Sequence, residues 1–562
     1  MKRALSLITV VLAASFTQAQ VLHVNNTNGT YLATETKSVQ SITFDQEQKL
    51  VSIAAQNQGA NVTSTFATEK VQNIALETAC NEALTYDLNP TISVESGTPA
   101  NFYEIADVIE TDENKDEYGD FVENFSSKQV ITVTFSEGSV KTSTLPSGIT
   151  ATIDKGHITI NSANSGITYT LKGTSSNGSI KIYSAKKFRI LTNRLTLTNP
   201  TGPAINIQSG KSVYFSIADG TTNTLCDGET YAAPTIAADG TEEDQKGTLF
   251  SEGQLIFDGY NAGTGKLNVT SKGGHAICSD DYIRVRGGNI NIASAAKDGF
   301  RTKEQFIIGR TEAYSPTITI NATNNGIDCS EGTLTIKAGK LNITSGGEAI
   351  KVEYEEETPD AAVIPDVYIR GGYINTLTTG EKSSAIKCTG NYTHSDGILY
   401  AQVNGNGSKI INSDGNVTIH SGKLTGIAKG TTSTDNTSAG GIKCDGKLII
   451  NNGEIAIDCT GKGAKGINCN NSVTVEGGNI TLLAKAQNDT NSSDDKKSRA
   501  ITASAITVNG GTVVASAYDH ALNATESIEL NGGAINAYSA TTDALNYNAT
   551  QTGGWLLTKD AE

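Results

Sequence analysis

From Gly440 to Cys469 the chain reads GGIKCDGKLIINNGEIAIDCTGKGAKGINC, and this stretch holds two copies of one phrase. The phrase is a small or polar residue, then Ala or Gly, Ile or Leu, a polar residue and often Cys, as in Gly440–Cys444 and Lys465–Cys469. Between the copies, a glycine turn at Gly453 interrupts apolar residues that alternate with polar ones. Alternation with period two is typical of β-strands and argues against helices as the main element.

The phrase recurs along the chain from about residue 265 to the C-terminus. Its central apolar residue is predicted at positions 277, 300, 327, 350, 386, 410, 442, 467, 501, 522 and 545. The shorter steps of 21–25 residues fit three short strands and three turns per repeat. Longer steps carry polar inserts at 355–366, 429–438 and 487–498. The sequence therefore predicts an all-β protein, a right-handed parallel β-helix with three strands per coil over residues 128–562.

Composition supports this fold and narrows the partners. The chain has 57 Gly and one Trp in 562 residues, and Gly supplies the positive-φ corners of each coil. Its net charge is −16, which argues against nucleic acid or an anionic membrane as partner, because both need a basic face. The same charge is compatible with bound cations.

The N-terminal 127 residues lie outside the repeat. Lys2 and Arg3 precede an apolar run of about 12 residues, too short to span a bilayer, so residues 1–19 are predicted to be a signal peptide. We expect a bacterial protein that is secreted or held at the cell surface. We also expect it to be a monomer and not to insert into a membrane. Residues 20–76 are predicted to be a small β module, and residues 77–127 an acidic, solvated linker.

Four of the eight cysteines follow the central Ile of a repeat by two residues: Cys329, Cys388, Cys444 and Cys469. That position faces the core, where a free Cys behaves as a small apolar residue. Cys444 and Cys469 lie on consecutive coils, about 4.8 Å apart by strand spacing. We expect free thiols, with a bridge between these two left open.

A family resemblance rests on motifs that follow one another between residues 149 and 309. They include Ser165–Gly173, Ile217–Leu225, Gly273–Ile277 and Lys297–Lys303. Residues 128–555 resemble a secreted, calcium-binding and carbohydrate-binding β-helix family with a pectate-lyase-like fold. The resemblance implies binding of cellulose or of acidic plant polysaccharides such as polygalacturonate, with calcium as cofactor and no settled catalytic activity.

Acidic residues of successive coils form the predicted metal site. Asp298 and Glu348 lie two residues before the central apolar residue, and Asp281 and Glu304 lie four after it. Together with Asp328 they predict an oxygen-rich column suited to Ca²⁺. The alternative is that these carboxylates form salt bridges with Arg301, Lys303 and Lys351 or are simply solvated.

Basic residues form a second column, one position after the central apolar residue. Arg301, Lys351 and Lys387 are the predicted contacts for a glycan, together with Tyr354. The alternative is a charge ladder in which Asp328 bridges Arg301 and Lys351. The scarcity of aromatic side chains favours a soluble charged glycan over a flat crystalline one.

The predicted function is non-catalytic binding of an acidic or plant-type polysaccharide with the help of calcium. One alternative is a pectate-type lyase, in which a Lys or Arg base removes a proton while calcium stabilises the developing charge. Another is an adhesive surface scaffold without sugar specificity. We name no catalytic residue, because no sequence feature shows a lysine or arginine with the lowered pKa that a base requires.

Overall fold

The computed structural model describes residues 8–10, 21–26, 31–35, 39–45, 49–57, 60–77, 92, 101–237, 240–354, 363–490 and 496–561. The chain divides into two compact units. Unit 1 comprises residues 1–94, 405–410 and 416–562, and unit 2 comprises residues 95–404 and 411–415. Both units consist mainly of β-strands, and no helix in the described ranges is long and apolar enough to cross a membrane.

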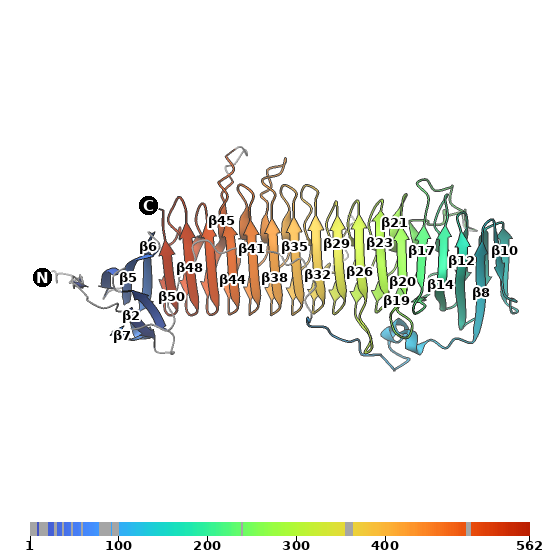
Figure 1. The fold of residues 1–562 in the computed structure, drawn as a ribbon, viewed down its shortest axis with the longest axis horizontal. Helices are drawn as coiled ribbons and strands as arrows, with labels where there is room; N and C mark the ends of the chain where they lie inside the picture. Colours follow the sequence, from blue (N-terminus) through green and yellow to red (C-terminus); the bar gives the residue numbers. More distant parts are fainter. Residues whose placement is uncertain are drawn as a thin grey trace. The chain divides into compact units, whose positions relative to one another are not determined.

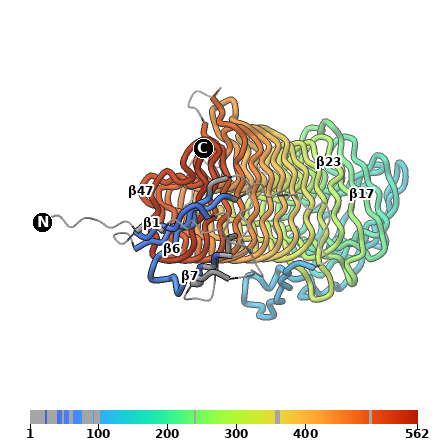
Figure 2. The backbone as a smooth tube through the Cα atoms, turned by 60° about the vertical axis from the view of Figure 1, so that its left-hand side comes forward, coloured from blue at the N-terminus to red at the C-terminus, as the bar shows by residue number. Residues whose placement is uncertain are grey.

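Unit 2 is a parallel β-helix in which each strand pairs with the third strand after it. In β21 (His275–Ser279), β24 (Phe300–Thr302) and β27 (Ile327–Cys329), Ile277 pairs with Phe300 and Phe300 with Ile327. The same spacing of three continues through the neighbouring strands, which Figures 1 and 2 show as stacked turns. The prediction of a parallel β-helix with three strands per coil is confirmed.

Three columns of strands make up these coils. The first contains β15 (Ile205–Ile207), β18 (Gly247–Ser251), β21, β24, β27, β30 (Ile350–Val352) and β33 (Ile386–Cys388). The second contains β16 (Val213–Ile217), β19 (Leu255–Asp258), β22 (Ile283–Val285), β25 (Phe306–Ile308), β28 (Leu334–Ile336), β31 (Val367–Ile369) and β34 (Tyr392–His394). The third contains β17 (Thr222–Cys226), β20 (Lys266–Thr270), β23 (Asn289–Ala295), β26 (Thr317–Ala322), β29 (Lys340–Ser345), β32 (Tyr373–Thr378) and β35 (Ile398–Val403).

The first strands of unit 2 include two antiparallel pairs. β8 pairs antiparallel with β9, and β10 pairs antiparallel with β11, while β8 also pairs in parallel with β12 and β11 with β13. The strands of this region are β8 (Gln129–Ser136), β9 (Ser139–Thr142), β10 (Ile149–Asp154), β11 (His157–Ser162), β12 (Ile167–Ser175), β13 (Ser179–Ser184) and β14 (Phe188–Thr198).

The repeat register departs from the prediction at one coil. Ile386 pairs with Ile411, which lies in β36 (Lys409–Ser413), so the central residue of that coil is Ile411 and not residue 410. Both side chains of the Ile410-Ile411 pair are buried. Sequence alone did not distinguish them because consecutive isoleucines fit the apolar pattern equally well.

The interior of unit 2 is a narrow stack of apolar side chains. Phe215, Phe257, Phe300 and Phe306 pack ring against ring, with centroids 5.2–6.4 Å apart. Their relative exposure is 0%, and offset or edge-on aromatic pairs add to the stabilisation that burial provides. Each coil therefore stabilises the next through both its core and its backbone hydrogen bonds.

The acidic segment before the β-helix contacts the coils of unit 2. We call residues 101–124 the strap; it contains the short 3₁₀ helices η3 (Asp116–Asp120) and η4 (Val122–Asn124). Ile105 N donates to Lys337 O, Asp107 N to Arg310 O and Gly372 N to Tyr103 O. Over this range the expectation of a solvated linker is wrong.

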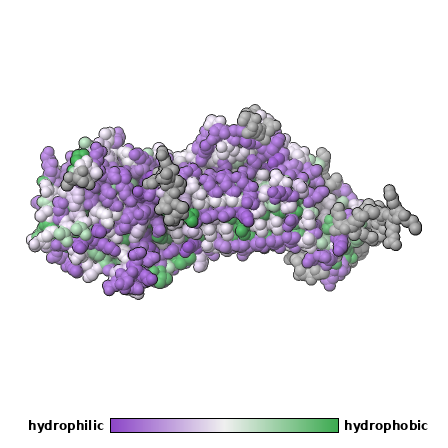
Figure 3. Space-filling view, turned by 180° about the vertical axis from the view of Figure 1, so that it is seen from behind, coloured by the Kyte–Doolittle hydropathy of each residue, from purple (hydrophilic) through white to green (hydrophobic). Residues whose placement is uncertain are grey.

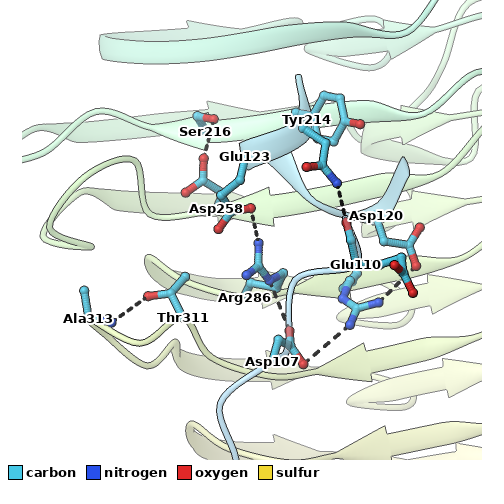
Figure 4. A network of polar contacts seen from close by, with 12 residues as sticks. Asp107, Glu110, Asp120, Glu123, Tyr214, Ser216, Asp258, Arg286, Thr311 and Ala313 are labelled. Atoms are coloured by element: carbon cyan, nitrogen blue, oxygen red, sulfur yellow. Dashed lines mark hydrogen bonds and ion pairs between the residues drawn. The ribbon is translucent and has the colours of Figure 1, made fainter. Parts of the chain in front are cut away.

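Charge pairing explains why these acids leave water. Asp107 is 5% exposed and lies 3.1 Å from Arg286, 3.4 Å from Arg284 and 3.2 Å from Lys337. Glu123 lies 2.8 Å from Arg286, and Asp120 lies 3.0 Å from Arg284 (Figure 4). The acidity of the segment predicts solvation, whereas in the structure it matches the buried cations Arg284 and Arg286 and the half-buried Lys337.

Unit 1 contains further coils of the same kind. Ile442 pairs with Ile467, and Ile467 with Ile501. The coil strands are β37 (Val417–Ile419), β38 (Lys423–Ala428), β39 (Gly440–Cys444), β40 (Leu448–Ile450), β41 (Glu454–Cys459), β42 (Lys465–Cys469), β43 (Ser472–Val475), β44 (Asn479–Ala484), β45 (Arg499–Val508), β46 (Thr512–Ala517), β47 (Leu522–Leu530), β48 (Ala534–Ser539), β49 (Thr550–Gln551) and β50 (Trp555–Lys559).

The predicted N-terminal β module belongs to unit 1 and covers its last coil strand. β6 pairs antiparallel with β50, placing Phe66 opposite Trp555 with their rings edge-on at 4.6 Å. The module's elements are β2 (Val21–Asn26), β3 (Tyr31–Glu35), β4 (Val39–Asp45), β5 (Leu50–Asn57), β6 (Ala60–Ala67), η2 (Thr68–Lys70) and β7 (Val71–Glu77). The module thereby occupies an edge that would otherwise be unpaired.

Of the predicted signal peptide, the described residues are Ile8–Val10. They form β1, which pairs antiparallel with β4. Cleavage after Ala19 stays a prediction.

Candidate functional site

A polar insertion in unit 2 forms one wall of a cleft. Residues 227–246 connect β17 to β18. The cleft has a volume of about 610 Å³ and is lined by residues 229–234, 242–246 and 273–275 together with Lys297. It therefore lies beside Gly273-Gly274-His275, one of the motifs on which the family resemblance rests.

Side-chain hydrogen bonds fix both ends of this insertion. Tyr231 Oη donates to Asp227 Oδ2 at 2.6 Å, and the same oxygen accepts from Ser271 Oγ at 2.7 Å. At the other end Glu243 accepts from Tyr183 Oη at 2.5 Å and from Lys181 Nζ at 2.7 Å. Because Asp227 is 1% exposed, the cleft wall is anchored to the coils.

Three carboxylates gather next to the cleft. One oxygen from each of Asp244, Glu252 and Asp280 lies within 4.8 Å of the others. Lys246 Nζ lies 2.8 Å from Asp244 and 2.6 Å from Asp280. One ammonium group thus faces three carboxyl groups, which leaves the cluster acidic.

The crowding raises the pKa values of this cluster. Burial, with the nearby charges of Asp280 and Asp244, raises the pKa of Glu252 to about 7. Burial also raises the pKa of Asp280 above its ordinary value, although Lys246 opposes the change. A divalent cation would relieve the repulsion that burial strengthens.

The donor set fits calcium. Ca²⁺ takes six to eight oxygen ligands and accepts carboxylates with waters or other oxygens in flexible geometry. Asp244, Glu252 and Asp280 would hold it, with waters or sugar hydroxyls completing the shell. The side chain of Lys246 is 42% exposed, so it can swing away from the carboxylates toward water.

The side chains of two predicted metal residues, Asp281 and Glu304, contact each other. Burial raises the pKa of Glu304, and the contact with Asp281 raises it further. Asp281 also accepts hydrogen bonds from Gln254 and from the backbone of Tyr282. This pair belongs to the same stack of coils as the three-carboxylate cluster, because Asp281 follows Asp280 directly.

The other predicted metal residues have different surroundings. Asp298 lies 3.0 Å from His275 Nδ1 and accepts from Asn324 and from the backbone of Asn325. Asp328 lies 3.1 Å from Arg301. Among the described residues, the Glu348 carboxylate does not group with the other predicted acids. The backbone N of Glu348 donates to Asn325 Oδ1 at 3.0 Å. In the described ranges, three-ligand geometry occurs at Asp244, Glu252 and Asp280, and the five predicted residues do not form such a group.

The predicted basic column forms a ladder of ion pairs. Asp328 Oδ2 lies 3.1 Å from Arg301 and 3.9 Å from Lys351, as the charge-ladder alternative requires. Glu353 lies 3.4 Å from Lys351 and 3.1 Å from Lys387. Tyr354 follows β30 and is half-buried. The repeat register does not predict the contacts of Glu353, because it lies two residues after Lys351 and not at the same strand position.

The cleft and the three-carboxylate cluster were not predicted from the sequence. A signal was present, because the acidic run Glu242-Glu243-Asp244 lies in the long interval between Ile207 and Leu249. The regular positions of the repeat begin at residue 277, and the interval lies before them, so the repeat does not mark it as an inserted loop. On the face shown in Figure 3, hydrophilic residues predominate and hydrophobic ones form small scattered areas.

The sequence matches the family model of the carbohydrate-binding domain-containing proteins over residues 154–485 and 461–544. These ranges cover more than half of the chain. The chain belongs to this family. Family membership supports polysaccharide binding, and the matched range includes the cleft, the carboxylate cluster and the basic ladder.

The chain was also compared with curated proteins and with solved structures. No curated protein matches the sequence. Among solved structures, the chain is similar to a polysaccharide lyase-like protein from C. thermocellum, determined as a gadolinium derivative. The two share 20% sequence identity with a TM-score of 0.32, and the match covers 57% of this chain and 97% of that chain.

Proposed function

We propose that this carbohydrate-binding family member binds an acidic polysaccharide without cleaving it, with calcium beside the cleft of unit 2. The observation that carries the proposal is the cluster of Asp244, Glu252 and Asp280, whose oxygens lie within 4.8 Å of one another. A calcium ion held by these three residues would need further oxygen ligands to complete its shell. Uronate carboxylates and hydroxyl groups are oxygen ligands of the kind that calcium accepts.

The cleft lining carries charges of both signs, so an anionic glycan would bind there through calcium together with the lysines. Lys246 and the exposed Lys297 line the cleft with the carboxylates of Glu229, Glu242, Glu243 and Asp244. Exposed pairings of this kind are individually weak. Affinity would therefore arise from several contacts along one polysaccharide chain.

The ladder of Arg301, Lys351 and Lys387, with Tyr354, is a second proposed contact surface. Its ammonium groups are partly neutralised by Asp328 and Glu353. A uronate carboxylate would have to compete with these internal acids. We therefore expect this surface to contribute less than the cleft, and Lys387→Met to weaken binding less than Lys297→Met.

The test combines binding and cleavage in one sample. Affinity electrophoresis with polygalacturonate measures binding with calcium or with chelator, and ultraviolet absorbance reports unsaturated products of a lyase. We expect calcium-dependent binding without products, weakened several-fold by Lys297→Met and unchanged by the exposed control Lys211→Met. Products that disappear in a lysine variant would establish the lyase, and no binding to acidic or neutral glycans would favour the adhesive scaffold.

Export, a secreted or cell-surface location and a monomeric state are also proposals. The apolar run after Lys2-Arg3 supports export. N-terminal sequencing of protein recovered from outside the cells should begin after Ala19. Light scattering of that protein should give the mass of one chain, and recovery of uncleaved cytoplasmic protein would contradict export.

A further inference from the structure

A small notch in unit 1 lies between two lysines. At the strand position of Lys465, the neighbouring coils carry Gly440 on one side and Arg499 on the other. Gly440 N donates to Ser408 O, so Lys409, which follows Ser408, lies on the coil next to Gly440. A Cβ at Gly440 would lie 2.4 Å from the backbone O of Lys465, so glycine allows these two coils to approach closely. A small notch lies here, lined by Lys409, Ser438, residues 439–443, Lys465 and Asn468. We call it the lysine notch.

The lysines of the notch are buried to different extents. Lys409 is 8% exposed, and its Nζ donates to Gly407 O at 2.6 Å. Lys443 Nζ lies 2.9 Å from Asp445. Lys465 Nζ lies 3.4 Å from Ser438 Oγ, and no carboxylate in the described ranges lies within ion-pair distance of it. None of the residues that line the notch is acidic.

Without a bound anion, the surroundings of Lys465 disfavour its positive charge. Burial, with the nearby charges of Arg499 and Lys496, lowers the pKa of Lys465 to about 8. At neutral pH most Lys465 side chains are still protonated, so a positive charge is held in a partly desolvated position. An anion at the notch would favour that charge and raise the pKa again.

The room available decides what kind of anion fits. The notch has space for about one water-sized group. A planar carboxylate can place one oxygen there while the sugar that carries it stays outside. That oxygen would accept hydrogen bonds from the ammonium group of Lys465 and the hydroxyl group of Ser438, and charge-assisted bonds of this kind are the stronger ones.

We propose that the lysine notch binds one carboxylate group, and that a uronate residue of an acidic glycan supplies it. Carboxylate binding follows from the notch itself, whereas the glycan as its source rests on the proposed function. The notch lies in unit 1 and the cleft in unit 2, so the two sites have separate residues. A variant of one site leaves the other intact.

Acylation of lysines at pH 8, followed by peptide mass spectrometry, tests the proposal in the full chain. A carboxylate that binds protonated Lys465 lowers the fraction of neutral amine that can react. We expect galacturonate to slow acylation of Lys465 several-fold, while the exposed Lys447 reacts at an unchanged rate. Galactose and chloride at matched ionic strength should have no effect.

Comparing the protection of Lys465 by different anions identifies the source of the carboxylate. Protection by galacturonate at lower concentration than acetate supports a glycan site, and equal protection by acetate would overturn that source. Equal protection by chloride or sulfate would mean an adventitious ion only, and no protection by any carboxylate would overturn the notch itself. Lys409→Met should weaken the protection of Lys465, whereas Lys447→Met should not.

The cleft variant Glu252→Gln separates this proposal from the proposed function. Protection of Lys465 by galacturonate should persist in that variant even where calcium-dependent polysaccharide binding is lost. Loss of protection in Glu252→Gln would show that the notch does not act on its own and would contradict the proposal.

Discussion

The Glu252 carboxyl group has a pKa of about 7 because it is buried beside Asp280 and Asp244. A glutamate in an unfolded chain has a pKa near ~4.3. Between these two values the folded protein holds a proton that the unfolded chain has released. Stability is therefore lost as pH rises through this window, and a bound cation would reverse the loss by favouring the ionised form.

We expect calcium to raise the melting temperature of the protein more at pH 8 than at pH 5. Above the pKa of Glu252 all three carboxylates can ligate calcium, whereas protons compete below it. Differential scanning calorimetry with calcium and with chelator measures the difference. Glu252→Gln should remove most of the calcium response and raise the melting temperature of the calcium-free protein at pH 8.

The control for this variant is Glu312→Gln, because Glu312 is exposed and the charge change is the same. It should keep the calcium response of the unchanged protein. A calcium response that is equal at both pH values and unaffected by Glu252→Gln would place the ion elsewhere.

At the scale of single elements, the strap is held by buried carboxylates, and of these Asp107 contacts the most cations. Asp107 contacts Arg284, Arg286 and Lys337 on coils of unit 2. Removing one partner of a buried ion pair costs about 3–5 kcal/mol, since the remaining charges stay buried without compensation. Asp107→Asn should therefore destabilise unit 2 by an amount within or slightly below that range.

Urea unfolding and limited proteolysis would measure this effect. The control is Asp112→Asn on the same strap, because Asp112 is exposed and its side chain accepts hydrogen bonds only from Asn114 nearby. Faster cleavage within 101–124 in Asp107→Asn but not in Asp112→Asn is the expected result. Equal stability of the two variants would contradict a structural role for the strap.

The N-terminal module gives a second prediction at this scale. Phe66 and Trp555 pack edge-on across the β6–β50 pair, and Trp555 is the one tryptophan of the chain. Phe66→Ala removes a buried aromatic ring, a change that costs about 3–5 kcal/mol in other proteins. We expect the tryptophan emission to move to longer wavelength in this variant, because water reaches the indole.

Tyr547 provides the comparison, because it is 45% exposed in the same unit. Tyr547→Ala should leave the tryptophan emission unchanged. If Phe66→Ala also left it unchanged, the module would not cover Trp555 in solution.

The sequence predicted the coils of the β-helix but not the packing of the strap. The coils were predictable because the central Ile, the glycine turn and the alternating pattern are local signals that recur at each repeat. The strap was not, because the partner of Asp107 is Arg286, far along the chain, and an isolated acidic run is usually solvated. Cross-strand neighbours such as Asp328 with Arg301 follow from the repeat register, whereas the Asp244–Asp280 approach depends on a loop path that no repeat specifies.

At the scale of the whole molecule, the apolar interior also contains the cysteines. Six of the seven described cysteines are buried: Cys278, Cys329, Cys388, Cys444, Cys459 and Cys469. Burial raises the pKa of Cys329 and of Cys388 to about 12. The thiolate is the reactive form, so the thiols of Cys329 and Cys388 should be inert while the coils are folded.

We expect a thiol reagent to label Cys226 slowly in the native protein and the six buried cysteines only in denaturant. Peptide mass spectrometry identifies each site. Cys444 Sγ and Cys469 Sγ lie 2.9 Å apart as free thiols, and labelling in denaturant without reductant decides whether they are bridged. Labelling of buried sites under native conditions would show that the coils open locally.

The strap has a mechanical consequence for unit 2. It contacts Tyr214, Arg284, Arg310, Lys337 and the backbone at Gly372, which belong to coils far apart along the stack. A pulling force that enters through residue 101 would load these contacts together, in shear, before it reached β8. Without the strap the same force would peel the first coil away alone. Single-molecule stretching of Asp107→Asn should therefore show a lower rupture force than the unchanged protein.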